Sequence, residues 1–91
     1  MLERTRNSPG DLGVGNLVKG SFVRRHEDGR VGVVSEVRSD GYAYVRWLLS
    51  WDETVKAARY WLDYVNIGDV EELPSSEVTE ALFDIKRLIL G

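Results

Sequence analysis

Arginine and aromatic side chains alternate along the first half of the chain, and these residue types have the clearest potential for binding. Tyrosine and arginine dominate the energetics of protein interfaces. Arginines among exposed rings also suit stacking on the bases of single-stranded nucleic acids. Both functions share one candidate binding face, whose members are Phe22, Arg24, Arg38, Tyr42, Tyr44 and Arg46. A third interpretation is that these side chains only stabilise a sheet through cross-strand pairs, or lie beneath another element.

Residues suited to catalysis or metal binding are sparse. His26 is the only histidine and the chain has no cysteine, so a nucleophilic triad would depend wholly on a histidine beside a charged turn. The acidic residues between 69 and 84 lack the spacing and glycine of a calcium loop. Gly13-Val14-Gly15 lacks the third glycine of a nucleotide-binding fingerprint. We therefore expect no enzymatic activity, no metal, no cofactor and no small-molecule substrate.

The composition predicts a small globular protein. The chain has 91 residues, 43% of them hydrophobic, and a formal net charge of −3. Residues 16–49 hold six basic and four acidic side chains, whereas residues 50–91 hold four basic and nine acidic ones. That asymmetry permits a nucleic-acid face, but the net acidity favours a protein partner or self-association. No apolar run is long enough to span a membrane, and the first residues lack the apolar core of a signal peptide, so we expect a cytoplasmic protein without a membrane partner.

The candidate face requires a β-meander over residues 20–49. Strand-like alternation brackets two turns, Glu27-Asp28-Gly29 and Ser39-Asp40-Gly41, which fit three-residue hairpin loops with glycine in the left-handed region. In the first hairpin, the register that follows places His26 opposite Arg30 and pairs Val23 with Val33. In the second, it pairs Val33 with Trp47, Ser35 with Val45, and Val37 with Ala43. Its other face pairs Arg38 with Tyr42, Glu36 with Tyr44, and Val34 with Arg46, and places Phe22 beside Val34. A two-residue loop at Asp40-Gly41 would instead put Val37 opposite Tyr44, and we favour the first register.

The flanking regions differ in how clearly they predict structure. Residues 1–16 are expected to form an extended arm, and residues 17–91 a single domain. Ser50-Trp51-Asp52-Glu53 has the spacing of a helix capping box, and Trp51, Val55, Ala58, Leu62 and Val65 then recur at helical spacing, which predicts a helix over 51–65. The alternative is a loop over 50–57 followed by a strand over 59–62. We slightly favour an intermediate, a helical turn near 51–57 followed by a strand near 58–63. A brief closing strand is expected over 69–73.

Pro74-Ser75-Ser76 then predicts the start of a helix over about 76–90, because serine is a common helix N-cap. Its apolar stripe, the candidate assembly helix, comprises Val78, Leu82, Phe83, Ile85, Leu88 and Ile89. We expect this stripe either to cap an open end of the barrel of its own chain or to pack against a second copy.

Two segments carry a family resemblance. Lys19-Gly20-Ser21-Phe22-Val23-Arg24, followed by Asp28-Gly29-Arg30-Val31-Gly32-Val33-Val34, resembles the opening strands of small SH3-like barrels of the KOW and Tudor-like branches. Val45-Arg46-Trp47 and Val70-Glu71-Glu72-Leu73 are similar to their closing strands. The resemblance covers about residues 18–73, and Gly32 matches the mid-strand glycine of the KOW pattern.

The resemblance implies an SH3-like antiparallel barrel, with a meander over 20–49 and closing strands over about 58–73, followed by the C-terminal helix. KOW modules bind RNA or proteins, Tudor-like ones often bind modified peptides, and many free-standing SH3-like proteins are phage-encoded. We therefore expect a non-enzymatic protein-interaction or assembly module, in keeping with an accessory protein of a phage or mobile element. The alternative is a KOW-like nucleic-acid-binding module that uses the basic and aromatic face together with Arg25.

Overall fold

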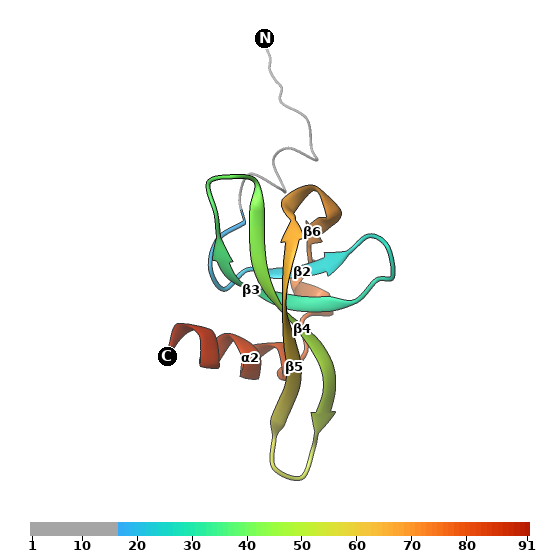
Figure 1. The fold of residues 1–91 in the computed structure, drawn as a ribbon. Helices are drawn as coiled ribbons and strands as arrows, with labels where there is room; N and C mark the ends of the chain where they lie inside the picture. Colours follow the sequence, from blue (N-terminus) through green and yellow to red (C-terminus); the bar gives the residue numbers. More distant parts are fainter. Residues whose placement is uncertain (1–16) are drawn as a thin grey trace.

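The computed structural model describes residues 17–91, and the predicted arm over 1–16 lies outside the described residues (Figure 1). The strands are β2 (Phe22–Arg25), β3 (Val31–Val37), β4 (Tyr42–Asp52), β5 (Ala57–Asn66) and β6 (Val70–Glu72). Two 3-10 turns, η1 (Ile67–Asp69) and η2 (Ser75–Glu77), flank β6, and the helix α2 (Glu80–Leu90) follows. All pairings are antiparallel, in the order β5-β4-β3-β2-β6. The predicted antiparallel meander with a C-terminal helix is thus confirmed, as an open sheet of five strands.

Both predicted turns place glycine at positive φ, +72° at Gly29 and +89° at Gly41. In the second turn the Arg38 amide donates to the Tyr42 carbonyl over 2.9 Å, which confirms the predicted three-residue loop. The first turn is one residue longer than predicted. The Arg25 amide donates to the Arg30 carbonyl, so Arg25 rather than His26 closes this hairpin.

The β3–β4 register is confirmed near the turn and wrong beyond it. Val37 pairs with Ala43 and Glu36 with Tyr44, as predicted. An irregularity between Val34 and Glu36 then leaves Ser35 without a partner on β4, and the extra residue reverses which side chains face the core. The observed pairs beyond it are Val34 with Val45, Val33 with Arg46, and Gly32 with Trp47. The predicted pairs Val33–Trp47, Ser35–Val45 and Val34–Arg46 are therefore wrong.

The β2–β3 register is shifted as well, because the first hairpin loop is longer than predicted. Val23 pairs with Gly32 instead of Val33, and Phe22 lies opposite Val33 instead of beside Val34. Val33 and Val34 are adjacent on β3, so they point to opposite faces of the sheet, and both are fully buried.

The sheet separates two apolar clusters. The inner cluster, on one face, consists of Leu17, Val23, Val34, Ala43, Val45, Trp47, Val65 and Val70. The outer cluster, between the other face and α2, has Val33, Leu73, Leu82, Ile85 and Ile89 at its centre. The inward side of α2 thus covers the sheet of its own chain.

The favoured helical turn near 51–57 is wrong, because this segment forms the end of a long hairpin, whereas the predicted strand near 58–63 is confirmed as part of β5. β4 continues to Asp52, and β5 begins at Ala57 and runs to Asn66. The Asp52 carboxylate accepts the Thr54 amide over 2.9 Å, so the acids that suggest a helix cap instead stabilise a turn. Lys56, at a φ of +55°, completes that turn. Figure 1 shows this hairpin projecting beyond the rest of the sheet.

The predicted C-terminal helix is confirmed, although α2 begins at Glu80 rather than near residue 76. The serines after Pro74 form η2, whose first backbone hydrogen bond runs from the Glu77 amide to the Pro74 carbonyl. No helix in residues 17–91 has the length and apolar character needed to cross a membrane.

Gly32 occupies a position where a side chain does not fit. A Cβ atom there would lie 2.6 Å from the Arg46 carbonyl oxygen and 2.9 Å from the Trp47 ring. We expect Gly32→Ala to reduce the free energy of unfolding by about 1–3 kcal/mol, as overpacking of a core does. Gly41→Ala is the matched control, because its Cβ would have open space and would cost only about 1–2 kcal/mol of left-handed strain. Urea denaturation of both variants measures the difference, and a Gly32→Ala protein as stable as the parent would contradict this packing.

Trp47 has no exposed surface and lies at the centre of the inner cluster. Its truncation to alanine should reduce the free energy of unfolding by about 3–5 kcal/mol, a large fraction of the stability of so small a domain. Thermal unfolding followed by circular dichroism checks this expectation. Trp61→Ala serves as the control, since Trp61 only packs against the cluster from outside and should cost less.

Candidate functional site

α2 covers only part of the outer sheet face. The β4–β5 pair Leu48–Tyr60 belongs to the cluster beneath the helix, whereas the next pairs along the hairpin, Arg46–Leu62 and Tyr44–Tyr64, lie beyond its centre. Alternation along each strand places all of these side chains on one face. We call the uncovered portion the tyrosine face, and it consists of Tyr42, Tyr44, Arg46, Leu62 and Tyr64.

The three tyrosine rings pack against one another. Tyr42 and Tyr64 are stacked, with centroids 4.9 Å apart and an interplanar angle of 11°. Tyr44 contacts Tyr64 at the same centroid distance but tilted by 45°. Leu62 and Tyr64 remain 53% and 44% exposed, and Tyr42 is 37% exposed. The result is a rigid aromatic surface with an exposed leucine beside it.

Asp40 organises one border of this face. Its Oδ2 accepts a hydrogen bond from the Tyr64 hydroxyl at 3.0 Å and from Arg38 Nε at 3.3 Å, while its Oδ1 accepts the Tyr42 amide at 3.1 Å. Partial desolvation is the largest single effect on the Asp40 carboxyl and acts against ionisation. The three hydrogen bonds together nevertheless hold the pKa of Asp40 below its ordinary value. Desolvation, followed by the hydrogen bond to Asp40, raises the pKa of Tyr64.

Arg46 forms the opposite border, next to the helix. Its guanidinium carbon lies 5.1 Å from the centroid of the Tyr60 ring, and Nη1 donates to the Tyr60 hydroxyl at 3.3 Å. A cation held over a ring in this way is oriented, and it is partly desolvated by the half-buried surroundings.

The other two residues of the predicted face lie apart from the tyrosines. Phe22 packs edge-on against Phe83 of α2, with centroids 5.2 Å apart, so the helix partly covers it. Arg24 pairs with Glu71 at 3.0 Å and with Glu77 at 2.6 Å. The predicted binding face is therefore divided, with Arg38, Tyr42, Tyr44 and Arg46 together and Phe22 and Arg24 beside the helix.

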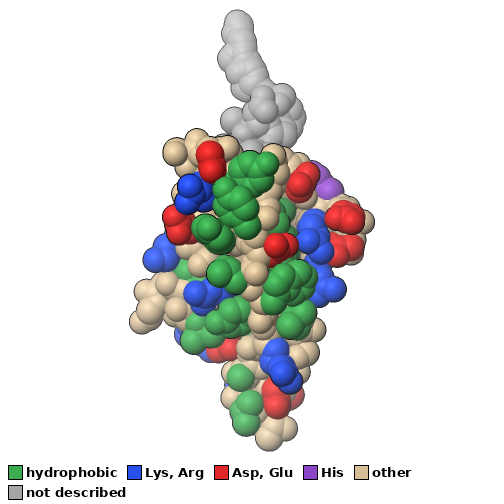
Figure 2. Space-filling view, viewed as in Figure 1, with side chains coloured by type: hydrophobic (Ala, Val, Ile, Leu, Met, Phe, Trp, Pro, Cys, Tyr) green, Lys and Arg blue, Asp and Glu red, His purple; other side chains and the backbone are tan. Residues whose placement is uncertain are grey.

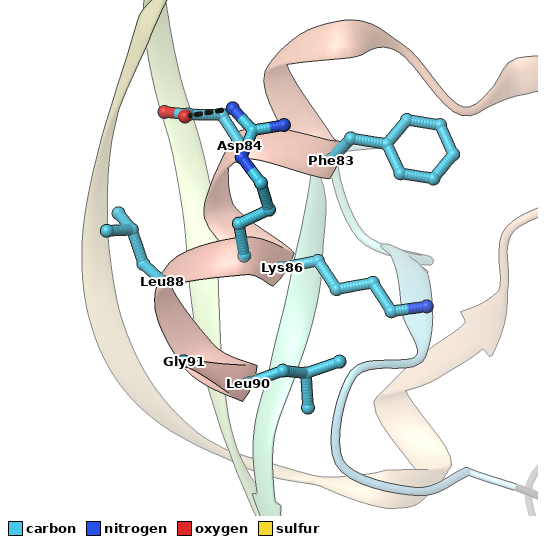
Figure 3. A pocket seen from close by; sticks show the side chains of 7 residues that line it. Phe83, Asp84, Lys86, Leu88, Leu90 and Gly91 are labelled. Atoms are coloured by element: carbon cyan, nitrogen blue, oxygen red, sulfur yellow. Dashed lines mark hydrogen bonds and ion pairs between the residues drawn. The ribbon is translucent and has the colours of Figure 1, made fainter.

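The candidate assembly helix is divided between inside and outside. Leu82, Ile85 and Ile89 are buried against the sheet and Val78 is half-buried. Phe83 and Leu88 are exposed, as is Leu90 beside them. Figure 3 shows Phe83 and Leu88 pointing to opposite sides of α2. Arg87 and Asp84 of the same helix form an ion pair with each other. The exposed apolar side chains of the helix thus do not form one continuous stripe.

Leu62 and Tyr64 belong to the site but not to the binding face predicted from the sequence. Their signal was the alternation of large side chains at Tyr60, Leu62 and Tyr64, which is typical of a strand with one apolar face. Within residues 17–91 no group of three or more histidine or acidic side chains is placed to hold a metal ion.

The contact between Tyr64 and Asp40 can be tested by titration. Asp40→Asn removes the carboxylate that raises the pKa of Tyr64 by hydrogen bonding and by its charge. We expect the pKa of Tyr64 to fall toward the ordinary tyrosine value, so the phenol ionises at lower pH than in the parent. The NMR chemical shift of the Tyr64 Cζ measures this directly, and the Tyr42 signal is the internal control. An unchanged Tyr64 titration would show that the hydrogen bond does not persist in solution.

Comparison of the chain with protein-family models, with curated proteins and with solved structures finds no match. The functional argument therefore depends on the geometry described above. Figure 2 shows hydrophobic side chains exposed on the side of the molecule where β4 and β5 lie, bordered by side chains of both charges.

Proposed function

We propose that this protein is a non-enzymatic protein-interaction module that uses the tyrosine face to hold its partner. The observation that carries the proposal is the exposed row of Tyr42, Tyr64 and Leu62 on a rigid sheet beside α2. Aromatic side chains that are already ordered lose little conformational entropy on binding, and tyrosine is enriched among the residues that contribute most to protein interfaces. A contiguous exposed apolar surface with a polar border is typical of a protein contact.

The alternative, nucleic-acid binding, is less well supported because the arginines of the predicted face are already engaged. Arg24 is held by two glutamates and Arg38 by Asp40. Arg46 lies over Tyr60. Binding to a phosphate backbone gains its affinity from basic side chains that displace counterions, and these arginines would first have to leave their present partners.

We further propose that the sheet is an SH3-like barrel in the sense of the sequence resemblance. The pairing of β2 with both β3 and β6 supports this, because the first described strand then joins the meander to the last strand. Curling of the strongly twisted sheet around the inner cluster would bring its two edges toward each other.

The function is tested by removing rings from the tyrosine face. Immobilised protein is exposed to nuclease-treated extract of the source cells, and the captured proteins are identified by mass spectrometry for the parent, Tyr42→Ser, Tyr64→Ser and the control Val55→Ser. Val55 is also an exposed apolar residue, but it lies in the turn at the far end of the β4–β5 hairpin. We expect a partner bound by the parent and by Val55→Ser to bind the two tyrosine variants at least about 30-fold more weakly, as for interface hot spots.

A labelled single-stranded oligonucleotide, titrated over a range of salt concentrations, tests the alternative. Steeply salt-dependent binding that is weakened by Arg46→Ala would support the nucleic-acid function instead. Protein capture that is equal for all four proteins would contradict the proposed role of the tyrosine face.

A further inference from the structure

β5 is an edge strand, and the direction of its outer backbone groups can be derived from the pairing. Tyr42 directs its carbonyl toward β3, where it accepts the Arg38 amide. Backbone groups of successive residues point to opposite edges of a strand, so the amide and carbonyl of Ala43 point toward β5. Ala43 and Val65 therefore form a hydrogen-bonded pair. Odd-numbered residues of β5 therefore direct their amides and carbonyls toward β4, and even-numbered residues direct theirs away from the sheet.

The chain caps this edge at two places. Asp84 of α2 accepts the outward amide of Ala58 at 2.8 Å. Asp63 accepts the outward amide of Tyr64 at 2.9 Å. Between them, the amides and carbonyls of Tyr60 and Leu62 form no hydrogen bond with another group of residues 17–91.

The open segment of the edge lacks the usual protection against strand pairing. Natural edge strands are blocked by charged side chains, proline or a bulge. Here the outward positions carry Tyr60 and the 53% exposed Leu62. The β5 register is regular from Tyr60 to Asn66, and the irregularity next to it adds a residue to β4, between Leu48 and Ser50, rather than to β5. An exposed apolar edge of this kind is a template for another strand.

We propose that β5 pairs with β5 of a second copy of this chain, antiparallel, about a twofold axis at Trp61. In this register Tyr60 lies opposite Leu62 of the second copy, and Leu62 opposite its Tyr60, both as hydrogen-bonded pairs. The open amides and carbonyls of the two chains then form four hydrogen bonds. The ladder stops at Ala58 and Tyr64, the two residues whose amides are already capped.

Charge complementarity selects this register. It places Arg59 opposite Asp63 of the second copy twice, at non-hydrogen-bonded positions where side chains approach most closely. Arg59 is exposed and forms no ion pair with residues 17–91. Asp63 forms one long ion pair, with 3.7 Å between its Oδ2 and Nη1 of Arg25.

Neighbouring registers are worse. An axis at Arg59 or at Asp63 would bring like charges together. An axis at Tyr60 or at Leu62 would require the capped amide of Ala58 or of Tyr64.

This inference rests on the proposed interaction function and deepens it by naming the partner surface. The interface is small, so we expect self-association in the micromolar range or weaker. Sedimentation of the parent from low micromolar to millimolar concentration should show the mass rising from 10.3 kDa toward twice that value. Leu62→Pro removes an outward amide that the fold does not use and should weaken association at least tenfold while the circular dichroism spectrum stays the same.

A charge exchange tests the register itself. Arg59→Asp and Asp63→Arg each create two like-charge pairs in a homodimer, so each variant alone should sediment as a monomer. Mixed in equal amounts they should form a heterodimer, because both cross-strand pairs again join opposite charges. Arg59→Lys keeps the charge and is the control, so it should associate like the parent. If Asp63→Arg fails to fold, the comparison of Arg59→Asp with Arg59→Lys still tests the role of the charge at position 59.

A parent that stays monomeric at millimolar concentration would overturn the inference, as would a dimer that tolerates Leu62→Pro or a mixture that stays monomeric. None of these results would affect the capture experiment with the tyrosine variants, so failure of this inference is distinguishable from failure of the proposed function.

Discussion

The contact between Gly32 and Trp47 is the constraint on which the rest of the structure depends. The two residues are direct neighbours across β3 and β4, and the ring fits only because position 32 has no side chain. Arg25 lies with its guanidinium carbon 5.1 Å from the centroid of the same ring, so β2 is held against it as well. A shift of the β3–β4 register by one residue would put a valine against the indole, and this fixes the register more strongly than alternation alone.

The irregularity at Ser35 follows from that constraint and makes α2 necessary. Near the turn, the pair Val37–Ala43 sets one register, and Gly32–Trp47 sets another that differs by one residue. The bulge reconciles them and directs Val34 into the inner cluster and Val33 to the outer face. Because Val33 is fully buried on that outer face, the sheet needs a second layer, which Leu82 and Ile85 of α2 supply.

Much of the meander and the helix could be predicted from the sequence, because alternation and turn glycines are local signals. The bulge could not, since the extra residue is determined by how Trp47 packs on a different strand. The strand β5 was only partly predictable because Ser50-Trp51-Asp52-Glu53 has the spacing of a helix cap, and the competing pairing with β4 is a tertiary effect. The candidate binding face predicted from the sequence therefore lacked Leu62 and Tyr64, and its division by α2 was not visible from sequence spacing.

The uneven charge of the two halves of the chain has an intramolecular explanation. Arg24 pairs with Glu71 and Glu77 from the acidic half, and the Arg25 guanidinium lies near Asp63. The carboxylates of Asp84 and Asp63 accept hydrogen bonds from backbone amides of β5, so they are already engaged within the fold. Apart from Arg59, the basic side chains of the sheet find their partners within the fold. The surface that remains for the proposed recognition is the uncharged row of tyrosines with Leu62. Beside it lies an edge strand whose two flanking charges, Arg59 and Asp63, are opposite in sign. Such a surface would discriminate by shape, backbone pairing and a short charge pattern, which is why we propose a protein strand rather than a polyanion as the partner.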